Sequence, residues 1–112
     1  MSETYDLFQL GRGHLRNGMA AQATVPLEKA KRAEPTSRSI REALGIAYFR
    51  IGRWTEAEAE FRALLELDPS DEFAHYALGR ALVNQGRRDE ATPHIKLARS
   101  LRPRSPDGNA LE

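Results

Sequence analysis

The stretch RALLELDPSDEFAHYALGRAL, residues 62–82, contains two apolar helical patterns joined by a short polar segment. Proline lacks a backbone N–H and disfavours helical geometry at the residue before it, so one helix is expected to end at Asp68. Ser70 is expected to cap the next helix, and Asp71 and Glu72 are favourable near its positive N-terminal end. The stretch therefore predicts a helix that stops at the proline and a second helix that begins almost at once.

The same arrangement recurs along the chain with a step of 34 residues. The columns that keep this step are Leu10, Leu44 and Leu78; Gly11, Gly45 and Gly79; Gly18, Gly52 and Gly86; Ala23, Ala57 and Ala91; Leu27, Phe61 and Ile95; and Pro35, Pro69 and Pro103. Apolar residues recur at helical spacing on both sides of the second glycine, which indicates two helices in each unit. That glycine can adopt the left-handed backbone conformation that ends a helix. The sequence thus predicts three consecutive helix pairs.

The composition describes one globular domain that is held together by packing alone. The 112 residues are 40% hydrophobic and 29% charged, and the formal net charge of +1 favours neither nucleic acid nor an anionic membrane as the partner. The absence of cysteine excludes a disulfide framework and a thiolate nucleophile. No run approaches the ~20 apolar residues of a membrane span, and the first residues lack the pattern of a signal peptide. We therefore expect a cytoplasmic protein with no membrane partner.

The middle unit resembles the tetratricopeptide repeat family. The family pattern W-x2-L-G-x2-Y…A-x3-F…P is matched by LGIAY at residues 44–48, followed by Ala57, Phe61 and Pro69. The resemblance implies an all-α fold, a right-handed α-solenoid of three helix-turn-helix repeats. It also implies that the first helix of each repeat lines an inner, concave wall on which extended or helical peptides bind.

The three units cover nearly the whole chain. We expect repeats at residues 4–37, 38–71 and 72–105, which together form a single domain over residues 1–105. The remaining residues, 106–112, are expected to be a short flexible tail that includes part of an expression scar.

Some positions depart from the family pattern. The tryptophan place holds Leu7, Arg41 and His75, and the tyrosine place holds His14, Tyr48 and Leu82. Polar Arg41 and His75 therefore predict two loosely buried sites. Pro26 and Pro93 fall inside second helices, which predicts short or bent helices that begin near Ala21 and Asp89.

The sequence offers little support for catalysis. The string GRGHLRNG, residues 11–18, begins like a dinucleotide-binding loop, but its third glycine is Gly18 where the motif needs residue 16, and a helical pattern precedes it. His14, His75 and His94 are too scattered for a helix-borne metal pair, and no activated nucleophile is visible. We therefore expect no enzymatic activity, no cofactor and no metal site.

The first helix of each unit carries a second face that is aromatic and basic, where a solvated face is expected to be merely polar. Leu15, Phe49 and Val83 on this face are expected to pack between neighbouring helices. The other residues form the candidate peptide-binding set, which consists of Tyr5, Phe8, Arg12, Arg16, Glu42, Ile46, Arg50, Phe73, Tyr76, Arg80 and Asn84.

The chemistry of this face suggests the class of ligand. Family members that grip the terminal carboxylate of chaperone tails use two lysines, two asparagines and an arginine, and by the resemblance those places hold Phe8, Phe73, Arg12, Ala43 and Ala77, so that clamp is absent. Arginine forks fit carboxylates, and aromatic rings offer apolar area with little entropy to lose. We therefore expect a non-catalytic protein–protein interaction module that binds a partner peptide with acidic and hydrophobic residues.

Two other functions remain open. The chain would serve an enzyme if it were the regulatory or targeting subunit of a complex. A nucleic-acid-binding accessory is less favoured, because no aromatic residues interleave the basic residues of the third unit. Those basic residues are Arg87, Arg88, Lys96, Arg99, Arg102 and Arg104.

The end of the array suggests a homodimer. Repeat arrays usually end in a polar capping helix, and the few residues after Pro103 are too rich in proline and glycine to form one. The last helix would then pair with the same face of a second copy, although Arg99 amid that face favours contact with water. The expected dimer residues are Ile95, Leu97, Ala98 and Leu101.

Overall fold

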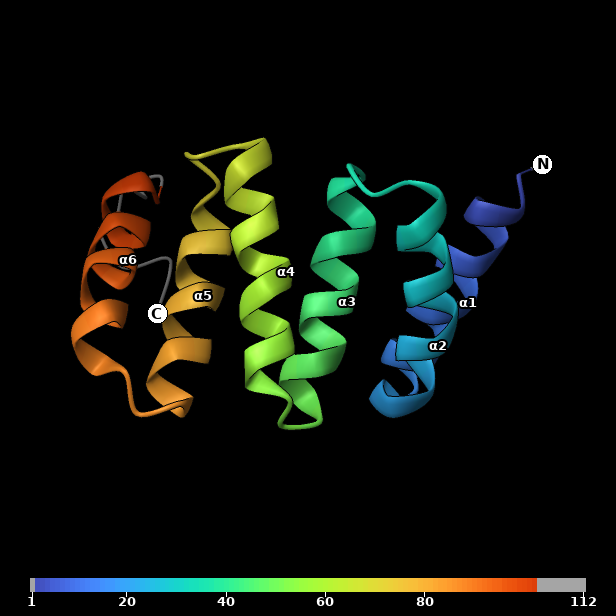
Figure 1. The fold of residues 1–112 in the computed structure, drawn as a ribbon, viewed down its shortest axis with the longest axis horizontal. Coiled ribbons are helices and arrows are strands. Elements are labelled where there is room, and N and C mark those ends of the chain that lie inside the picture. The colour runs from blue at the N-terminus through green and yellow to red at the C-terminus, as the bar shows by residue number, and fades with distance from the viewer. Residues whose placement is uncertain (1, 103–112) are drawn as a thin grey trace, which may run out of the picture.

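The computed structural model describes residues 2–102, and these residues form six α-helices. The helices are α1 (Glu3–Arg16), α2 (Ala20–Ala33), α3 (Arg38–Arg50), α4 (Trp54–Leu67), α5 (Glu72–Asn84) and α6 (Arg88–Leu101). Each helix packs against the next one along the chain, and α1 also contacts α3. Figure 1 shows the resulting row of antiparallel helices. This is the predicted all-α solenoid of three helix pairs, and the expected tail at 106–112 lies outside the described residues.

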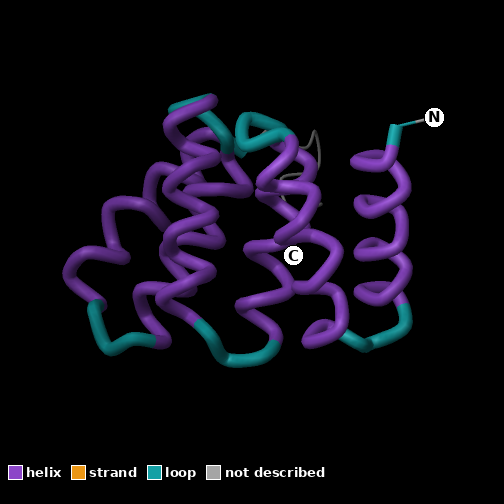
Figure 2. Tube along the Cα trace, turned by 45° about the vertical axis from the view of Figure 1, so that its right-hand side comes forward, coloured by secondary structure: helices purple, strands orange, loops and turns teal. Residues whose placement is uncertain are grey.

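The connections lie alternately at the two opposite ends of the helices, as Figure 2 shows. Within each pair the connection turns at a glycine with positive φ: 73° at Gly18, 78° at Gly52 and 79° at Gly86. Only glycine adopts this left-handed conformation without a steric cost from Cβ, so the predicted role of these residues is confirmed. Between pairs the connection passes through Pro35 and Pro69, where the sequence predicted that one helix stops and the next begins.

The first helix of each pair has an N-cap side chain, and the second does not. Ser2 accepts from Tyr5 N, Ser37 accepts from Ile40 N, and Asp71 accepts from Ala74 N. The expectation that Ser70 caps the third of these helices is therefore wrong. Asp71 occupies that position because the turn after Pro69 is one residue longer than expected, and the Ser70 N–H instead donates to Asp68 Oδ1 at 3.0 Å.

A second set of glycines allows the two helices of each pair to approach closely. A methyl group on Gly11 would fall 2.5 Å from Leu27 Cγ, one on Gly45 would fall 2.4 Å from Phe61, and one on Gly79 would fall 2.6 Å from Ile95 Cγ1. These are closer than carbon atoms approach without a clash, so each large side chain fits only because the facing residue lacks Cβ. The repeating glycine and large-apolar columns are thus two sides of one contact. This contact explains why Gly11, Gly45 and Gly79 recur with the same step as the large apolar residues.

The core lies between consecutive helices along the whole row. Its largest fully buried side chains are Leu27, Leu44, Phe61, Leu64, Leu78 and Leu82. Two clusters are present, one between the first and second pairs and one between the second and third, and Tyr48 packs against both. As predicted, Leu15, Phe49 and Val83 pack against these clusters. The middle pair therefore contributes to the packing on both of its sides.

Pro26 and Pro93 lie inside α2 and α6, as the sequence predicted, but neither helix is shortened. Each has 14 residues, the same length as α4, which contains no proline. The helices begin at Ala20 and Arg88, each one residue before the expected start. The expectation of short helices is therefore wrong, because packing along the whole length outweighs one missing backbone hydrogen bond.

The described residues contain no helix that is both long enough and apolar enough to cross a membrane.

Candidate functional site

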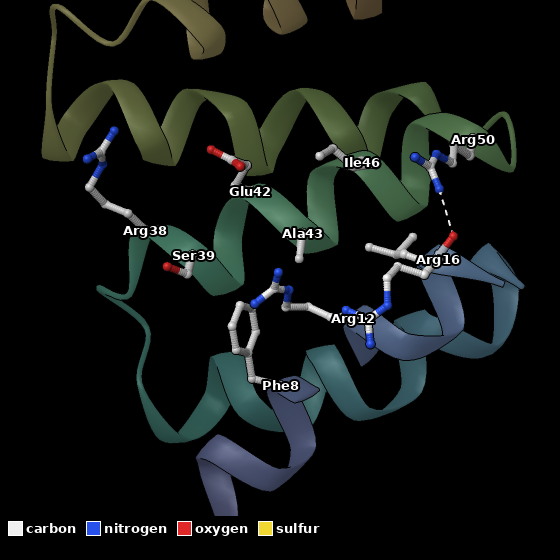
Figure 3. A pocket seen from close by; sticks show the side chains of 10 residues that line it. Phe8, Arg12, Arg16, Arg38, Ser39, Glu42, Ala43, Ile46 and Arg50 are labelled. Carbon is white, nitrogen blue, oxygen red and sulfur yellow. Dashed lines mark hydrogen bonds between the residues drawn. The ribbon is translucent and has the colours of Figure 1, made fainter. Parts of the chain in front are cut away.

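Two hollows lie side by side along α1, α3 and α5. The first, which we call the arginine pocket, has a volume of about 500 Å³ and lies between α1 and α3 (Figure 3). Its lining consists of Phe8, Arg12, Leu15, Arg16, Arg38, Ser39, Glu42, Ala43, Ile46 and Arg50. The second, which we call the aromatic pocket, has a volume of about 280 Å³ and lies between α3 and α5. Its lining consists of Ile46, Phe49, Arg50, Phe61, Phe73, Tyr76, Ala77 and Arg80.

The arginine pocket holds guanidinium groups by contacts that leave most of their N–H donors free. The guanidinium carbon of Arg12 lies 5.5 Å from the centre of the Phe8 ring, within the range of a cation–π contact. Arg50 donates to the backbone oxygen of Leu15 at 3.1 Å, as Figure 3 shows. The exposed Arg16 lies on α1 one turn after Arg12. Because a guanidinium carries five donors, each of these groups retains the capacity to bind a carboxylate.

Glu42 is the acidic residue that lines the arginine pocket. Burial raises the pKa of its carboxyl, and the nearby charge of Asp71 raises it further, whereas Arg38 lowers it. Arg38 itself is engaged, because its guanidinium pairs with Asp71 at 2.5 Å, and this bond raises the pKa of Arg38. The charge of Arg38 is therefore paired, whereas Arg12, Arg16 and Arg50 supply the free positive charge of the pocket.

The aromatic pocket is built on a T-shaped pair of rings. The Phe61 and Phe73 rings have their centres 5.9 Å apart at an interplanar angle of 84°. Phe61 is buried and anchors this wall to the core, whereas Tyr76 on α5 is 41% exposed. The guanidinium carbon of Arg80 lies 5.2 Å from the centre of the Phe49 ring and 5.9 Å from that of Tyr76. The pocket thus combines apolar ring faces with the cations Arg50 and Arg80.

The two pockets form one continuous groove, because Ile46 and Arg50 line both of them. Along this groove the chemistry changes from cationic beside α1 to aromatic beside α5. None of the ion pairs formed within residues 2–102 involves a groove arginine other than Arg38. By contrast, arginines elsewhere on the chain, such as Arg53, Arg62 and Arg87, pair with glutamates.

The structure brings most of the predicted peptide-binding residues together. Nine of them line the groove: Phe8, Arg12, Arg16, Glu42, Ile46, Arg50, Phe73, Tyr76 and Arg80. Tyr5 and Asn84 line neither pocket, and both are exposed at the outer ends of α1 and α5. Arg38 lines the groove but was not among the predicted residues, although its place directly after the capping Ser37 puts it in the first turn of α3. Leu15 and Phe49 also line the pockets, in addition to packing between helices.

The four predicted dimer residues do not form one exposed face. Ala98 has no exposed surface and therefore cannot contact a second copy, so its assignment to a dimer interface is wrong. Ile95 fills the space above Gly79, whereas Leu97 is 41% exposed and Leu101 is partly buried. A homodimer through Ile95, Leu97 and Leu101 stays a prediction, and light scattering of the wild type beside Leu97→Glu tests it.

Two of the histidines that are scattered in the sequence meet in the fold. His75 on α5 and His94 on α6 have their Nδ1 atoms 3.1 Å apart. The expectation that Arg41 and His75 are both loosely buried is wrong for His75, which is only 6% exposed. No group of three or more histidine, aspartate or glutamate side chains suited to hold a metal ion occurs in the described part of the chain.

Comparison with known proteins identifies a family that these repeats resemble. A family model described as TPR repeat matches residues 45–86. The TPR repeat-containing protein PA4299 of Pseudomonas aeruginosa is 37% identical over 82 residues, which cover 73% of this chain and 34% of that protein. The chain spans between 6% and 34% of the length of the curated relatives that it matches.

Solved structures share the fold. A mutant of MamA superposes with a TM-score of 0.87 at 29% identity, over 92% of this chain and 75% of that one. The second TPR of Spaghetti (RPAP3), solved with an HSP90 peptide, superposes with a TM-score of 0.83 at 21% identity, over 90% of this chain and 94% of that one. At that identity the second likeness shows the fold alone.

Proposed function

Since the chain belongs to the tetratricopeptide repeat family, we propose that it is a protein-interaction module whose groove along α1, α3 and α5 binds a partner peptide or helix. Domains of this family mediate protein–protein interaction, and the fold is typically non-catalytic. The proposal includes that the chain has no catalytic activity of its own.

One observation carries this proposal. Within the described residues, the groove exposes arginines that pair with no carboxylate, and these arginines lie beside aromatic rings that line the open groove. Arg12 and Arg80 stack on rings, so they are held in place while their N–H donors stay free. Stacked, weakly hydrated guanidinium groups are well suited to bidentate contacts with carboxylates. An exposed aromatic hollow beside such cations is the usual composition of a binding surface.

The groove favours a ligand with two chemically different segments. Acidic residues fit the arginine pocket, and an aliphatic or aromatic residue fits the aromatic pocket. Glu42 lies in the arginine pocket and would repel a uniformly anionic strand, which favours a peptide over nucleic acid. In the third repeat, Arg87 is paired with Glu58 and Glu90, and Arg102 with Glu72, so the basic stretch is partly neutralised. These pairs further disfavour the nucleic-acid alternative, and Arg104 lies outside the described residues.

The wider assignment is also a proposal. The chain spans at most 34% of its curated relatives, so their activities do not transfer to it directly. A regulatory or targeting role in an enzyme complex is compatible with the same groove, and a cytoplasmic location stays a prediction. Capture of partners followed by mass spectrometry distinguishes a single partner from an enzyme complex.

The groove is tested with a peptide array that varies the number and order of glutamate and leucine or phenylalanine residues. We expect the best peptides to contain both classes. Arg12→Glu combined with Arg80→Glu should weaken their binding by tenfold or more, because hydrogen bonds to charged groups contribute about 1.5–3 kcal/mol each. Tyr76→Ala should weaken binding without changing its salt dependence, since apolar contacts are not screened. None of these variants should change the helix content in circular dichroism.

The matched control is Arg88→Glu, which reverses an exposed charge on α6 outside the groove. It should leave peptide binding unchanged. Chemical-shift mapping with the best peptide gives a second check. If signals near Lys96 and Arg99 move while those of Phe8, Arg12 and Tyr76 stay still, the groove assignment is wrong and the third repeat is the site.

A further inference from the structure

One pair of columns joins the two helices of the second and third repeats, and the residues in these columns differ in chemistry in all three repeats. The paired residues lie 19 positions apart: Leu7 and Pro26, Arg41 and Glu60, and His75 and His94. In the second repeat the pair is a salt bridge of 2.9 Å between Arg41 and Glu60. In the third repeat it is a contact between two imidazoles. The third repeat thus has a titratable pair where the second has a permanent ion pair.

The two polar pairs also share a backbone partner. Arg41 Nε donates to Pro35 O at 2.9 Å, and His75 Nε2 lies 2.8 Å from Pro69 O, which is the equivalent oxygen one repeat later. A carbonyl oxygen only accepts, so His75 Nε2 must carry a proton to make this bond. In the neutral ring the other nitrogen, Nδ1, is then an acceptor. The Pro69 contact therefore fixes the tautomer of His75.

This tautomer fixes the state of His94 in turn. The Nδ1 atoms are 3.1 Å apart, whereas the ring centres are 5.3 Å apart, so the nitrogen edges face one another. His94 Nδ1 must supply the proton of the bond between them. A first additional proton can bind His94 Nε2 without disturbing this bond. A second can bind only at His75 Nδ1, where it would place two N–H groups against each other.

The surroundings offer little compensation for a second charge. Burial lowers the pKa of His94, the charges of His75 and Arg62 lower it further, and Glu90 opposes this. Glu90 is the carboxylate whose charge acts on His94, and it is already paired with Arg87 and Arg62. Two adjacent imidazolium ions would therefore repel each other, and Glu90 would offset this repulsion only in part.

We propose that the His75–His94 pair is a pH-responsive contact that holds α6 against α5 while the bond between the rings is intact and loosens α6 when both rings are protonated. Helix α6 packs against α5 on one side, and no helix covers its other side within the described residues. The position of α6 therefore depends on its contact with α5. The aromatic pocket uses Phe73 and Tyr76 on α5, and loosening α6 removes support from the back of that helix. Acid should thus weaken the third repeat before the first.

The direction in which pH changes the stability follows from the difference in proton binding between the folded and the unfolded chain. Where the pKa of a histidine is lower in the folded chain than in the unfolded chain, the unfolded chain binds more protons between the two values. Stability is then complete above the unfolded value of 6.5 and decreases as the pH falls below it. One excess proton on opening makes the opening equilibrium about tenfold more favourable for each unit of pH, and two protons about a hundredfold.

Ring nitrogen NMR on the unmodified chain is the first test. At pH 8 we expect the proton on Nε2 in His75 and on Nδ1 in His94. On acidification the first additional proton should bind His94 Nε2, and the bond between the two rings should persist at that stage. A proton on Nδ1 of His75 at pH 8, or a first additional proton on His75 in place of His94, would overturn the proposal.

Amide hydrogen exchange between pH 7.5 and pH 5.5 is the second test, with rates corrected for the intrinsic effect of pH. In the wild type the opening of α6 should become more than tenfold more favourable per pH unit below 6.5, which corresponds to an uptake of more than one proton, whereas the opening of α2 should change little. The control is the double variant His75→Arg with His94→Glu, which installs the pair of the second repeat. Its α6 should lose this pH dependence, and an equal dependence in wild type and variant contradicts the proposal.

A second variant covers the case in which the double variant does not fold. His94→Gln retains an N–H donor for His75 Nδ1 and cannot take up a proton. It should reduce the excess protons taken up on opening of α6 to one at most. An unchanged slope in this variant would show that the pH dependence arises elsewhere in the chain.

Discussion

The middle repeat and the two outer repeats carry equivalent residues that lie in very different environments. Leu44 in the second repeat and Leu78 in the third have no exposed surface, whereas Leu10 in the same column is 53% exposed. The cause is the neighbour: Leu44 packs on α2 and Leu78 on α4, but within the described residues no helix precedes α1. In a solenoid a residue's environment is therefore set by its place in the array as well as by its place in the repeat.

The first repeat shows how the chain adapts to this difference. Ile40 and Ala43 flank Leu44 and are buried, and the equivalent residues beside Leu10 are Asp6 and Gln9. Polar residues thus replace apolar ones on the face of α1 that no other helix covers within residues 2–102. At the other end the fully buried Phe61 corresponds to the partly buried Ile95.

The largest expected loss in the free energy of unfolding comes from a substitution at the centre of the middle repeat. Phe61→Ala removes a fully buried ring that fills the space above Gly45 and supports Phe73, so we expect a loss of about 3–5 kcal/mol in the free energy of unfolding. Ile95→Ala, the matched change in the third repeat, should cost clearly less because Ile95 is only partly buried. Urea unfolding monitored by circular dichroism measures both. Equal losses would show that the middle repeat has no special position.

The next effect compares two residues of one column. Leu44→Ala should cost about 2–5 kcal/mol, as expected for a fully buried leucine. Leu10→Ala should change the free energy of unfolding by no more than about 0.5 kcal/mol, because half of the side chain is already in contact with water. A large loss with Leu10→Ala would mean that α1 has a covering partner in solution. The same urea experiment, repeated at several protein concentrations, distinguishes these cases.

These contrasts also show what the sequence can and cannot predict. The step of 34 residues predicts the helices and the glycine turns, because each recurs in the same columns of all three repeats. It does not predict that Arg38 pairs with Asp71, or that His75 meets His94, because such contacts depend on how neighbouring helices are rotated. The repeat itself carried a signal for the histidines, since Arg41 and Glu60 occupy the same two columns with opposite charges.

The sequence does not predict where the groove ends, for the same reason. Tyr5 and Asn84 share the helical face of the other candidates, but they lie near the ends of their helices, beyond the reach of the neighbouring first helix. Periodicity gives the face of a helix and says nothing about where along its length a neighbour stands.

A smaller effect concerns the ion pair at the centre of the second repeat. Glu60 is 4% exposed and accepts from Lys31 at 3.0 Å and from Arg41 at 2.9 Å, which joins α2, α3 and α4. Glu60→Gln keeps the shape and removes the charge, so we expect a loss of about 1–3 kcal/mol. The lower part of that range is favoured, because the side chains of Lys31 and Arg41 are about one-fifth exposed and can reach water. The free energy of unfolding at pH 7 checks this value, and no loss would mean that the network contributes nothing net.

The smallest effect sharpens the contrast between Tyr48 and the equivalent Leu82 of the third repeat. Tyr48 donates to Glu28 across the first and second repeats, whereas Leu82 has no polar atom to offer. Burial raises the pKa of the Glu28 carboxyl, but the hydrogen bonds from Tyr48 and Lys31 outweigh it, so the net pKa is lowered. Tyr48→Phe should therefore cost about 0.5–1.5 kcal/mol at pH 7, the usual net worth of one hydrogen bond.

The pH dependence of this change identifies its cause. A carboxyl with a lowered folded pKa stabilises the chain above its unfolded value of 4.5, and this stabilisation is lost as the pH falls below it. The difference between wild type and Tyr48→Phe should accordingly be constant from pH 7 to pH 5 and shrink toward pH 3. If the difference stayed constant down to pH 3, the tyrosine would act through the packing of its ring edge. The hydrogen bond to Glu28 would then contribute nothing to stability, and this bond would not distinguish the second repeat from the third.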